Sequence, residues 1–336
     1  MSSPTNERVL VTGATGFIGG RLARSLVDDG HRVRALVRRG TDPSRLPAME
    51  LVVGDLVEPG SLEAAAEGCA VVYHVAAVTS SRSGSNRELE DVNVQGSANI
   101  AAAAARAGAR RFVHVSSCGV YGYRNRFPAN ESTPLHPDTP YRISKARAER
   151  VVFEIASKTR LPVVVARLAS IYGPGASNWL RFCRSIRANR FRMIGDGRNP
   201  VHLGHVLDIV DGLRRCADTP GIEGRCYNLA GAEPVAIGDL VATFAQALGV
   251  RTTRRSWPAF PFRVTRHVDL ALCRYLGMKI QRLHSYDLFL SGRSFDIARA
   301  RRELGFRPRI SAAEGLTALV EGYFENGSID SREGAR

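Results

Sequence analysis

Residues 7–20 read ERVLVTGATGFIGG, an apolar run that leads into a glycine-rich turn and then into a helical pattern. The aliphatic residues at 9–11 predict a short strand buried on both faces, as in a parallel sheet. Glycine after such a strand permits a tight turn, a close approach of a ligand to the backbone, and close packing of the next helix. The glycines stand at every third position: Gly13, Gly16 and Gly19.

The helix that this turn opens is expected to run from about Gly16 to about Leu26, with an apolar face formed by Ile18, Leu22 and Leu26. Its first N–H groups and the positive end of its dipole point at the turn, which suits a pyrophosphate. A second strand is expected over residues 33–37. A glycine turn alone is weak evidence, but the order strand, turn, helix, strand indicates dinucleotide binding.

Composition is that of an ordinary globular protein, with 44% apolar and 24% charged residues in a chain of 336. The formal charge of +15 invites a nucleic-acid or membrane interpretation. Because the basic residues are almost all arginine and are scattered along the chain, we instead expect an anionic cofactor or small-molecule substrate and no nucleic acid. One local group of arginines stays as an alternative anion site: Arg251, Arg254, Arg255, Arg263 and Arg266.

The six cysteines are dispersed, without a C-x-x-C pair or His/Cys ligand spacing, so we expect neither a metal site nor a disulfide framework. The first residues are polar and do not resemble a signal peptide. No apolar run approaches the length needed to span a bilayer, so no membrane span is expected. These features together favour a cytoplasmic protein.

Strand and helix patterns alternate through the first half of the chain, which predicts an α/β fold, a doubly wound parallel sheet of the Rossmann type. We expect a nucleotide-binding domain over residues 1–174, to which residues 201–232 return, and a smaller, mostly C-terminal substrate lobe over residues 175–330. Further strands are expected at 50–53, 70–75, 111–115, 163–166, 191–194 and 225–229, and helices at 61–67, 93–107, 140–157, 179–188 and 206–217.

Tyr141 and Lys145 lie one turn apart in a helix whose start is marked by Thr139 as N-cap and Pro140 at the first helical position. A phenol with a pKa of about 10 exchanges protons poorly at neutral pH. A cation about 4 Å away at a dielectric near 20 contributes about 4 kcal/mol, enough to lower that pKa by about three. This pair is therefore a candidate general acid/base; the alternative is an exposed tyrosine and lysine on a surface helix.

Ser116 and Ser117 end the strand expected at 111–115, at the carboxyl edge where open α/β sheets bind ligands. A hydroxyl there could hydrogen-bond a substrate oxygen as the charge on that oxygen changes. The alternative is a serine that only shapes the turn.

These motifs occur together and in order, and in that combination the chain resembles the extended short-chain dehydrogenase/reductase superfamily. This group contains the NAD-dependent epimerases and dehydratases and the enzymes similar to 3β-hydroxysteroid dehydrogenase. The resemblance extends almost to the C-terminus. Its motifs are TGATGFIG (12–19), GDL (54–56), HVAA (74–77), NVQG (93–96), VSSCGVYG (115–122), YRISK (141–145) and FDIARARRELGFRP (295–308).

The resemblance implies that Tyr141 is the general acid/base, that Lys145 holds the ribose and lowers the pKa of Tyr141, and that Ser117 polarises the substrate oxygen. It also implies that Asp55 meets the adenine. The implied cofactor-binding residues are Gly13, Thr15, Gly16, Phe17, Ile18, Gly19, Arg38, Asp55, Leu56, Ala76, Ala77, Tyr141 and Lys145.

The cofactor is expected to be NADP(H), with NAD(H) as the alternative. Where NAD enzymes carry an acidic residue for the ribose 2′-hydroxyl, the second strand here ends in Val37, Arg38 and Arg39. Arginine attracts a 2′-phosphate, whereas a carboxylate would repel it.

The expected activity is interconversion of a secondary alcohol and a ketone by hydride transfer, with Ser117, Tyr141 and Lys145 as the triad. A nucleotide-sugar 4-epimerase or dehydratase is the alternative. It comes second because nucleotide-sugar members of the superfamily carry an arginine where this chain has Val201. A regulator that only senses the dinucleotide is a further alternative, which the retained Tyr-x-x-x-Lys disfavours. Asn178 and Arg198 are candidate substrate contacts. Analogy with the superfamily also suggests a homodimer.

Overall fold

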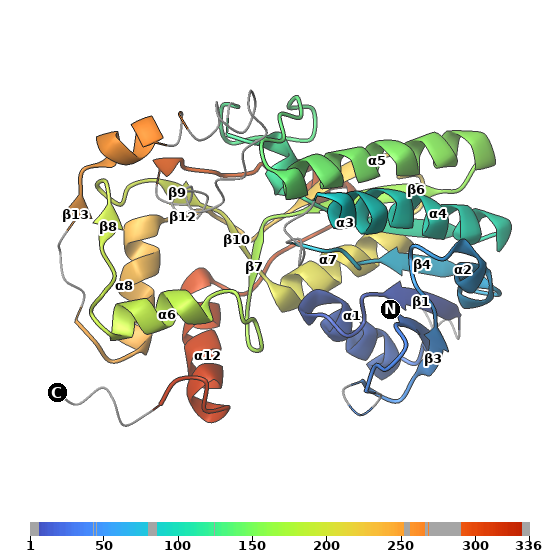
Figure 1. Cartoon of the computed structure of the whole chain (residues 1–336), viewed down its shortest axis with the longest axis horizontal. Coiled ribbons are helices and arrows are strands. Elements are labelled where there is room, and N and C mark those ends of the chain that lie inside the picture. Colours follow the sequence, from blue (N-terminus) through green and yellow to red (C-terminus); the bar gives the residue numbers. More distant parts are fainter. Residues whose placement is uncertain are drawn as a thin grey trace.

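The computed structural model describes residues 7–42, 44, 46–79, 86–123, 125–251, 256–265, 268 and 290–330. The described chain forms a Rossmann-type α/β fold with a second, smaller group of helices and short strands beside it (Figure 1). Three of the arginines proposed as an alternative anion site, Arg254, Arg255 and Arg266, lie outside the described residues.

A seven-stranded sheet, parallel throughout, forms the larger part, and its strand order is β11-β6-β5-β4-β1-β2-β3. The order reverses at β1, which places the glycine turn at the switch point where such sheets bind ligands. The expected strands of this sheet are confirmed within two residues at each end. Their bounds are β1 (Arg8–Thr12), β2 (Arg32–Val37), β3 (Glu50–Val53), β4 (Val71–His74), β5 (Arg111–Ser117), β6 (Val163–Leu168) and β11 (Cys226–Leu229).

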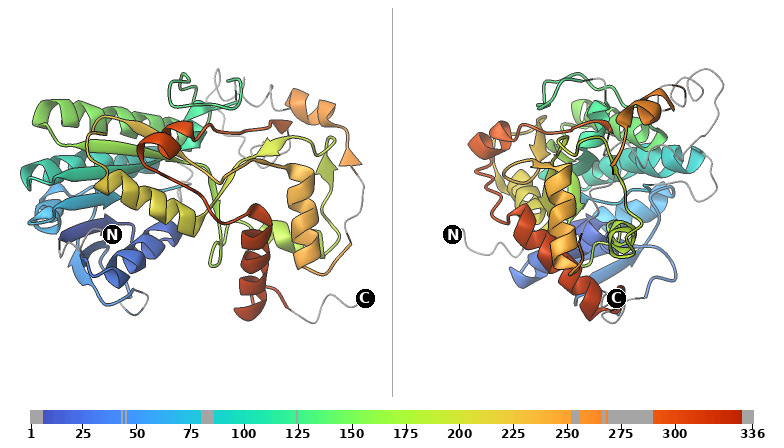
Figure 2. Two further views of the ribbon diagram at one scale, coloured as in Figure 1. Left: turned by 180° about the vertical axis from the view of Figure 1, so that it is seen from behind. Right: turned by 90° about the vertical axis from the view of Figure 1, so that its left-hand side faces the viewer.

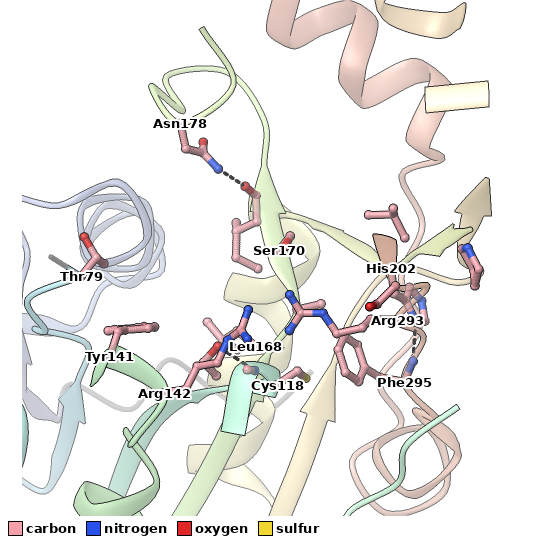
Figure 3. A pocket seen from close by; sticks show the side chains of 17 residues that line it. Thr79, Cys118, Tyr141, Arg142, Leu168, Ser170, Asn178, His202, Arg293 and Phe295 are labelled. Carbon is pink, nitrogen blue, oxygen red and sulfur yellow. Dashed lines mark hydrogen bonds between the residues drawn. The ribbon is translucent and has the colours of Figure 1, made fainter. Parts of the chain in front are cut away.

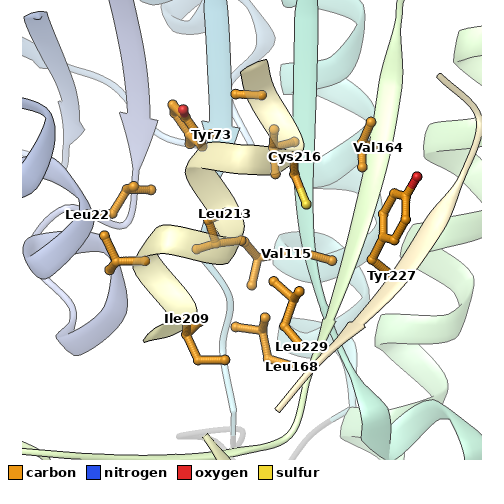
Figure 4. Close-up of a cluster of buried hydrophobic side chains, with 14 of the residues drawn as sticks. Leu22, Tyr73, Val115, Val164, Leu168, Ile209, Leu213, Cys216, Tyr227 and Leu229 are labelled. Carbon is orange, nitrogen blue, oxygen red and sulfur yellow. The ribbon is translucent and has the colours of Figure 1, made fainter. Parts of the chain in front are cut away.

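Helices cover both faces of this sheet (Figure 1). The helices α1 (Phe17–Asp28) and α7 (Val206–Asp218) pack on one face, and α2 (Pro59–Ala66), α4 (Gly96–Arg106) and α5 (Pro140–Thr159) on the other. Strand residues alternate between the two faces, so that Val9 and Val11 belong to one core and Leu10 to the other. Figure 4 shows the first core, where Leu22 of α1 and Leu213 of α7 meet strand residues such as Val115 and Leu168.

The helix expected over residues 93–107 begins earlier and is irregular. The chain is helical from α3 (Arg87–Leu89) through the π-helical turn η2 (Glu90–Gln95) into α4. The side chain of Asn93, inside η2, exchanges two hydrogen bonds with the backbone of Val78 (2.8 and 2.9 Å). This contact ties the start of the helix to the segment that follows β4.

The second group of elements packs around its own apolar cluster, built mainly from α6 (Leu180–Arg187), α8 (Ile237–Ala247) and α12 (Ala312–Glu325). Figure 2 shows these three helices together beside the open end of the large sheet. The remaining elements are η3 (Cys118–Tyr121), α11 (Ala298–Glu303), β7 (Ser170–Tyr172), β8 (Met193–Ile194), β9 (Pro200–Val201), β10 (Leu203–His205), β12 (Val235–Ala236) and β13 (Ser256–Trp257). Within the described part of the chain, no helix combines the length and the apolar composition that crossing a bilayer requires.

Candidate active site

In the turn between β1 and α1, neighbouring backbone atoms occupy the space where side chains at Gly13 and Gly19 would lie. Gly13 has φ of +74°, and a Cβ on it would lie 2.8 Å from the backbone nitrogen and Cα of Ala76. A Cβ on Gly19 would overlap the carbonyl oxygen of Gly13. The turn therefore requires glycine at both positions, and α1 begins beside it with Gly16 as N-cap and no side-chain cap on its first N–H groups. This is the cradle that a pyrophosphate fits.

A buried hydrogen-bond chain holds the turn against β4. Ser97 donates to the carbonyl of Asn93 (2.6 Å), so its hydroxyl oxygen accepts from His74 Nε2 (2.8 Å). The other ring nitrogen of His74 then accepts from the Thr12 hydroxyl (2.8 Å), which in turn accepts from the N–H of Ala76 (3.2 Å). Burial, and next the charge of Lys145, lower the pKa of His74 to about 3, so this ring is neutral.

The other expected cofactor residues lie along the same carboxyl edge of the sheet. Ala76 and Ala77 follow β4 and are half-buried, and so are Phe17 and Ile18 at the start of α1, whereas Thr15 is exposed. Asp55 and Leu56 follow β3; the N–H of Asp55 donates to Ser61 (3.0 Å).

Arg38 follows β2 and is exposed. No ion pair of Arg38 is found with any other described residue. The register pairs Val37 with Val53, so Arg38 and Asp55 emerge from neighbouring strands at one end of the edge.

Tyr141 lies in the first turn of α5, where the Thr139 hydroxyl caps the helix by accepting from the N–H of Arg142 (3.3 Å). Tyr141 is half-buried, and Lys145, one turn later, is only 2% exposed. Burial lowers the pKa of Lys145 to about 8, against the opposing charge of Glu149. Burial also raises the pKa of Tyr141 to about 12, and the charge that counters this rise is that of Arg142. The expected lowering of the Tyr141 pKa by Lys145 is therefore not found: desolvation of the phenol is the largest cause of the shift, and Arg142, not Lys145, is the charge that opposes it.

Ser117 ends β5, and its hydroxyl oxygen accepts a hydrogen bond from the N–H of Gly119 (3.0 Å). The hydroxyl hydrogen remains able to donate to a substrate oxygen. The neighbouring Ser116 plays a different role, because it is buried and donates to Glu149. The structure therefore separates the two serines: Ser117, which the resemblance singled out, lines the cavity described below, and Ser116 lies in the core.

A buried ion pair that the sequence analysis missed lies beneath these residues. Arg167 on β6 and Glu149 on α5 are 5% and 3% exposed and approach to 2.7 Å. Arg167 also donates to the hydroxyl of Tyr121 (3.0 Å), which donates to Asn228 (2.7 Å). The available signal was spacing, because Glu149 stands four residues after Lys145 on the same helix face.

A cavity of about 370 Å³ opens at this edge of the sheet, and both Ser117 and Tyr141 line it (Figure 3). Asn178 lines it too, whereas Arg198 does not: its side chain is 90% exposed and lies 3.9 Å from Asp196. Arg198 therefore lies on the surface, outside this cavity. The full lining is Thr79, Ser117, Cys118, Gly119, Tyr141, Arg142, Leu168, Ala169, Ser170, Ile171, Asn178, Pro200, Val201, His202, Ser291, Arg293 and Phe295.

Two further lining residues hold the wall of the cavity in place. His202 accepts from the N–H of Phe295 at Nδ1 (3.1 Å) and donates from Nε2 to the carbonyl of Gly231 (3.0 Å). Both nitrogens are engaged, and burial lowers the pKa of His202. The Cys118 thiol donates to the carbonyl of Arg167 (3.2 Å), and burial raises its pKa, so it is not poised as a thiolate nucleophile. Among the described residues no group of three His, Cys, Asp or Glu side chains is arranged to hold a metal ion.

The sheet order and the glycine turn define the class: a Rossmann-type α/β protein, with its candidate site at the carboxyl edge of the sheet. The chain belongs to the NAD dependent epimerase/dehydratase family, whose model matches residues 9–230. The relatives of this chain include oxidoreductases, epimerases and dehydratases.

Three comparisons show this range. The 4-hydroxy-2-methyl-3-oxo-4-farnesyl-3,4-dihydroquinoline-1-oxide ketoreductase of Stigmatella aurantiaca is 32% identical, over 93% of this chain and 95% of the relative. The UDP-glucose 4-epimerase of Mycolicibacterium smegmatis is 31% identical, over 96% of this chain and 99% of the relative. The crystal structure of gox2253 matches with a TM-score of 0.82 and 27% identity, over 97% of this chain and 100% of that one.

Proposed function

We propose that this protein is an NADP-dependent oxidoreductase that interconverts a secondary alcohol and a ketone. One observation carries the proposal: a single cavity is lined by Ser117 from β5 and Tyr141 from α5, and Lys145 lies buried one helical turn behind the tyrosine. The similarity to a ketoreductase supports the same reaction.

A nicotinamide cofactor, when bound, supplies or takes up the hydride. The residues expected to hold it are the glycine turn and the start of α1 for the pyrophosphate, and Lys145 for the ribose. Ser117 donates a hydrogen bond to the substrate oxygen and orients it. Tyr141 gives its proton to that oxygen when the ketone is reduced and takes the proton when the alcohol is oxidised. Burial raises the pKa of Tyr141 to about 12, so the phenol carries its proton at neutral pH.

NADP(H) is proposed over NAD(H) because Arg38 stands exposed at the end of β2. A charged hydrogen bond to a 2′-phosphate contributes about 1.5–3 kcal/mol, which is about 10- to 100-fold in affinity. Arg38→Glu should therefore weaken NADPH binding by about that factor and leave NADH binding nearly unchanged, measured by nucleotide fluorescence. Arg32→Glu, at the opposite end of the same strand, is the matched control. Equal losses for both nucleotides would contradict the assignment.

The reaction is tested by Tyr141→Phe, which should lower kcat for ketone reduction by about 10²–10⁴-fold while NADPH still binds. Tyr227→Phe is the control, because its hydroxyl bonds Glu303 away from the cavity (2.7 Å). Turnover by Tyr141→Phe equal to that of the unaltered protein would refute the role of the phenol. A panel of cyclic and open-chain ketones is offered as substrate, and turnover is measured as the loss of NADPH absorbance at 340 nm.

A nucleotide-sugar 4-epimerase or dehydratase is the second candidate, since the similarity to a UDP-glucose 4-epimerase is of the same order as that to the ketoreductase. Val201, at the position where nucleotide-sugar members carry an arginine, is buried and lines the cavity with an apolar side chain, which favours the first candidate. Inversion of UDP-glucose without net change in NADPH would establish the second candidate instead.

We further infer a cytoplasmic homodimer that pairs α4 and α5 of two copies. Analogy with the superfamily is the basis of this pairing, and Ile143 on α5, whose apolar side chain is 42% exposed, is a position at which to test it. Light scattering on the purified protein tests the pairing: a monomer at working concentration would contradict it, and Ile143→Glu should shift a dimer toward monomer.

A further inference from the structure

The substrate cavity holds a pair of arginines that the proposed reaction does not use. Arg142 follows the catalytic tyrosine on α5, and Arg293 enters from the C-terminal segment (Figure 3). Both guanidinium carbons lie 4.4 Å from the ring centroid of Tyr123, and both groups donate to its hydroxyl, at 2.9 and 3.0 Å. One tyrosine thus brings two guanidinium groups to one wall of the cavity.

Both arginines are fixed by the fold. Arg142 pairs with Asp138 (2.5 Å), and its side chain is 13% exposed. Arg293 lies in a β-bridge with Val201, and its N–H donates to the carbonyl of Pro200 (2.7 Å). Because both groups are already ordered, little conformational entropy would be lost when they bind a ligand.

The wall of the cavity that carries Arg142 and Arg293 begins next to Ser117, the residue proposed to contact the reacting oxygen. A Cβ on Gly119 would lie 3.1 Å from the hydroxyl oxygen of Ser117 and 3.4 Å from Nε of Arg142. The absence of a side chain at Gly119 therefore leaves the proposed oxygen-polarising hydroxyl and Nε of Arg142 both within 3.4 Å of one point at the cavity wall. A substrate whose carbonyl or hydroxyl oxygen meets Ser117 would present its neighbouring atoms to Arg142.

The rest of the lining indicates what else the substrate carries. Leu168, Ile171, Val201 and Phe295 supply apolar surface, and no Asp or Glu is among the described residues that line the cavity. Asp138 balances the charge of Arg142, but the two guanidinium groups still bring N–H donors to this wall, and arginine matches a carboxylate with two parallel hydrogen bonds.

We propose that Arg142, Arg293 and Tyr123 form an anion subsite that holds a carboxylate of the substrate close to the reacting carbon, so that the substrate is an apolar 3-hydroxy acid or the corresponding 3-oxo acid. This inference rests on the proposed alcohol–ketone reaction. In such an acid one carbon atom separates the carboxylate from the carbinol carbon, C3. We therefore expect the carboxylate to meet Arg142 when the oxygen on C3 meets Ser117. The diphosphate of a nucleotide sugar would have to lie farther away, beyond the width of the sugar ring.

The test uses two probes that differ only in the anion: 3-hydroxydecanoate and its methyl ester. Binding to the full chain with NADP⁺ is measured by calorimetry, and oxidation by NADPH formation. The acid should bind at least about tenfold more tightly than the ester. Arg293→Met should remove this preference, Arg293→Lys should restore part of it, and Arg302→Met, an exposed arginine on α11, should leave it unchanged.

The outcomes separate the two proposals. If the acid binds in an arginine-dependent way but yields no NADPH, the anion subsite is supported and the proposed reaction fails. If acid and ester are oxidised equally well, or if the preference survives Arg293→Met, the subsite is overturned and the reaction stands. If UDP-glucose binds more tightly than the acid and this binding depends on Arg293, the arginines bind a diphosphate and the carboxylate proposal is overturned. The carboxylate proposal is also overturned if neither the acid nor the ester binds.

Discussion

Removal of the Glu149 carboxylate should destabilise the protein strongly. Glu149 is 3% exposed and accepts hydrogen bonds from Arg167 on both of its oxygens and from Ser116 on one of them. The change to alanine would leave the Arg167 guanidinium, itself 5% exposed, as a positive charge in the core without its carboxylate. Breaking one partner of a buried ion pair typically destabilises a fold by about 3–5 kcal/mol.

The same helix offers a matched control. Glu154, five residues later on α5, pairs with Arg150 at 2.8 Å, but these two side chains are 50% and 82% exposed. The distance is nearly that of the buried pair, so exposure is the main difference. Because solvent screens the exposed pair, Glu154→Ala should change stability by less than about 0.5 kcal/mol.

Urea unfolding followed by circular dichroism measures both variants, with the free energy of unfolding extrapolated to water. Glu149→Gln keeps the shape and one acceptor oxygen, so it should fall between Glu149→Ala and the unaltered protein and gives a measurement if the alanine variant does not fold. A loss for Glu149→Ala within about 1 kcal/mol of the loss for Glu154→Ala would refute the reasoning. Burial would then not determine how much this ion pair contributes to the free energy of unfolding.

Three further changes test other positions. Lys145→Met should abolish turnover yet stabilise the fold at pH 7 by on the order of 3 kcal/mol, because burial lowers the Lys145 pKa from 10.5 to about 8. The protonated lysine therefore disfavours folding, so the gain is full below about pH 8 and fades toward pH 10.5, which urea titrations across that range measure. His114→Leu should leave stability unchanged or raise it by about 1 kcal/mol, since both buried ring nitrogens lack a partner among the described residues; a lower melting temperature would contradict this. Gly19→Ala should destabilise the turn by about 1–3 kcal/mol and weaken NADPH binding, whereas Gly60→Ala on α2, with open space around it, should do neither.

Much of the large sheet could be predicted from the sequence because its signals are local. The strand before Gly13, the capped start of α5 at Thr139 and the alternation of strand and helix each lie within a few consecutive residues. The positions of Ser117 and Tyr141 in one cavity follow from the same rules, because the carboxyl ends of parallel strands meet at one edge.

The second group of elements could be predicted only in part. The helix expected at 179–188 is present as α6, and the strand expected at 191–194 contains β8. The strands β9, β12 and β13 are two residues long and pair with distant segments of the chain, so no local run of residues predicts them. Arg293 enters the cavity by such a pairing, and its hydrogen bond to Tyr123 joins residues 170 positions apart. The electrostatics also differed from expectation: spacing placed an ammonium near Tyr141, but burial, which spacing does not reveal, raises the pKa of that phenol.

The polar stripe of α5 explains why the site and the core depend on each other. Tyr141, Lys145 and Glu149 follow one another at intervals of four, so the stripe runs from the cavity into the interior. A lysine this deep loses its charge easily, and the carboxylate one turn below it opposes that loss by raising the Lys145 pKa. The same carboxylate joins α5 to β6 through Arg167 and to β5 through Ser116, the neighbour of Ser117. Glu149, a residue that does not line the cavity, thus both favours the charged form of the lysine against its burial and contacts the strand that carries the serine.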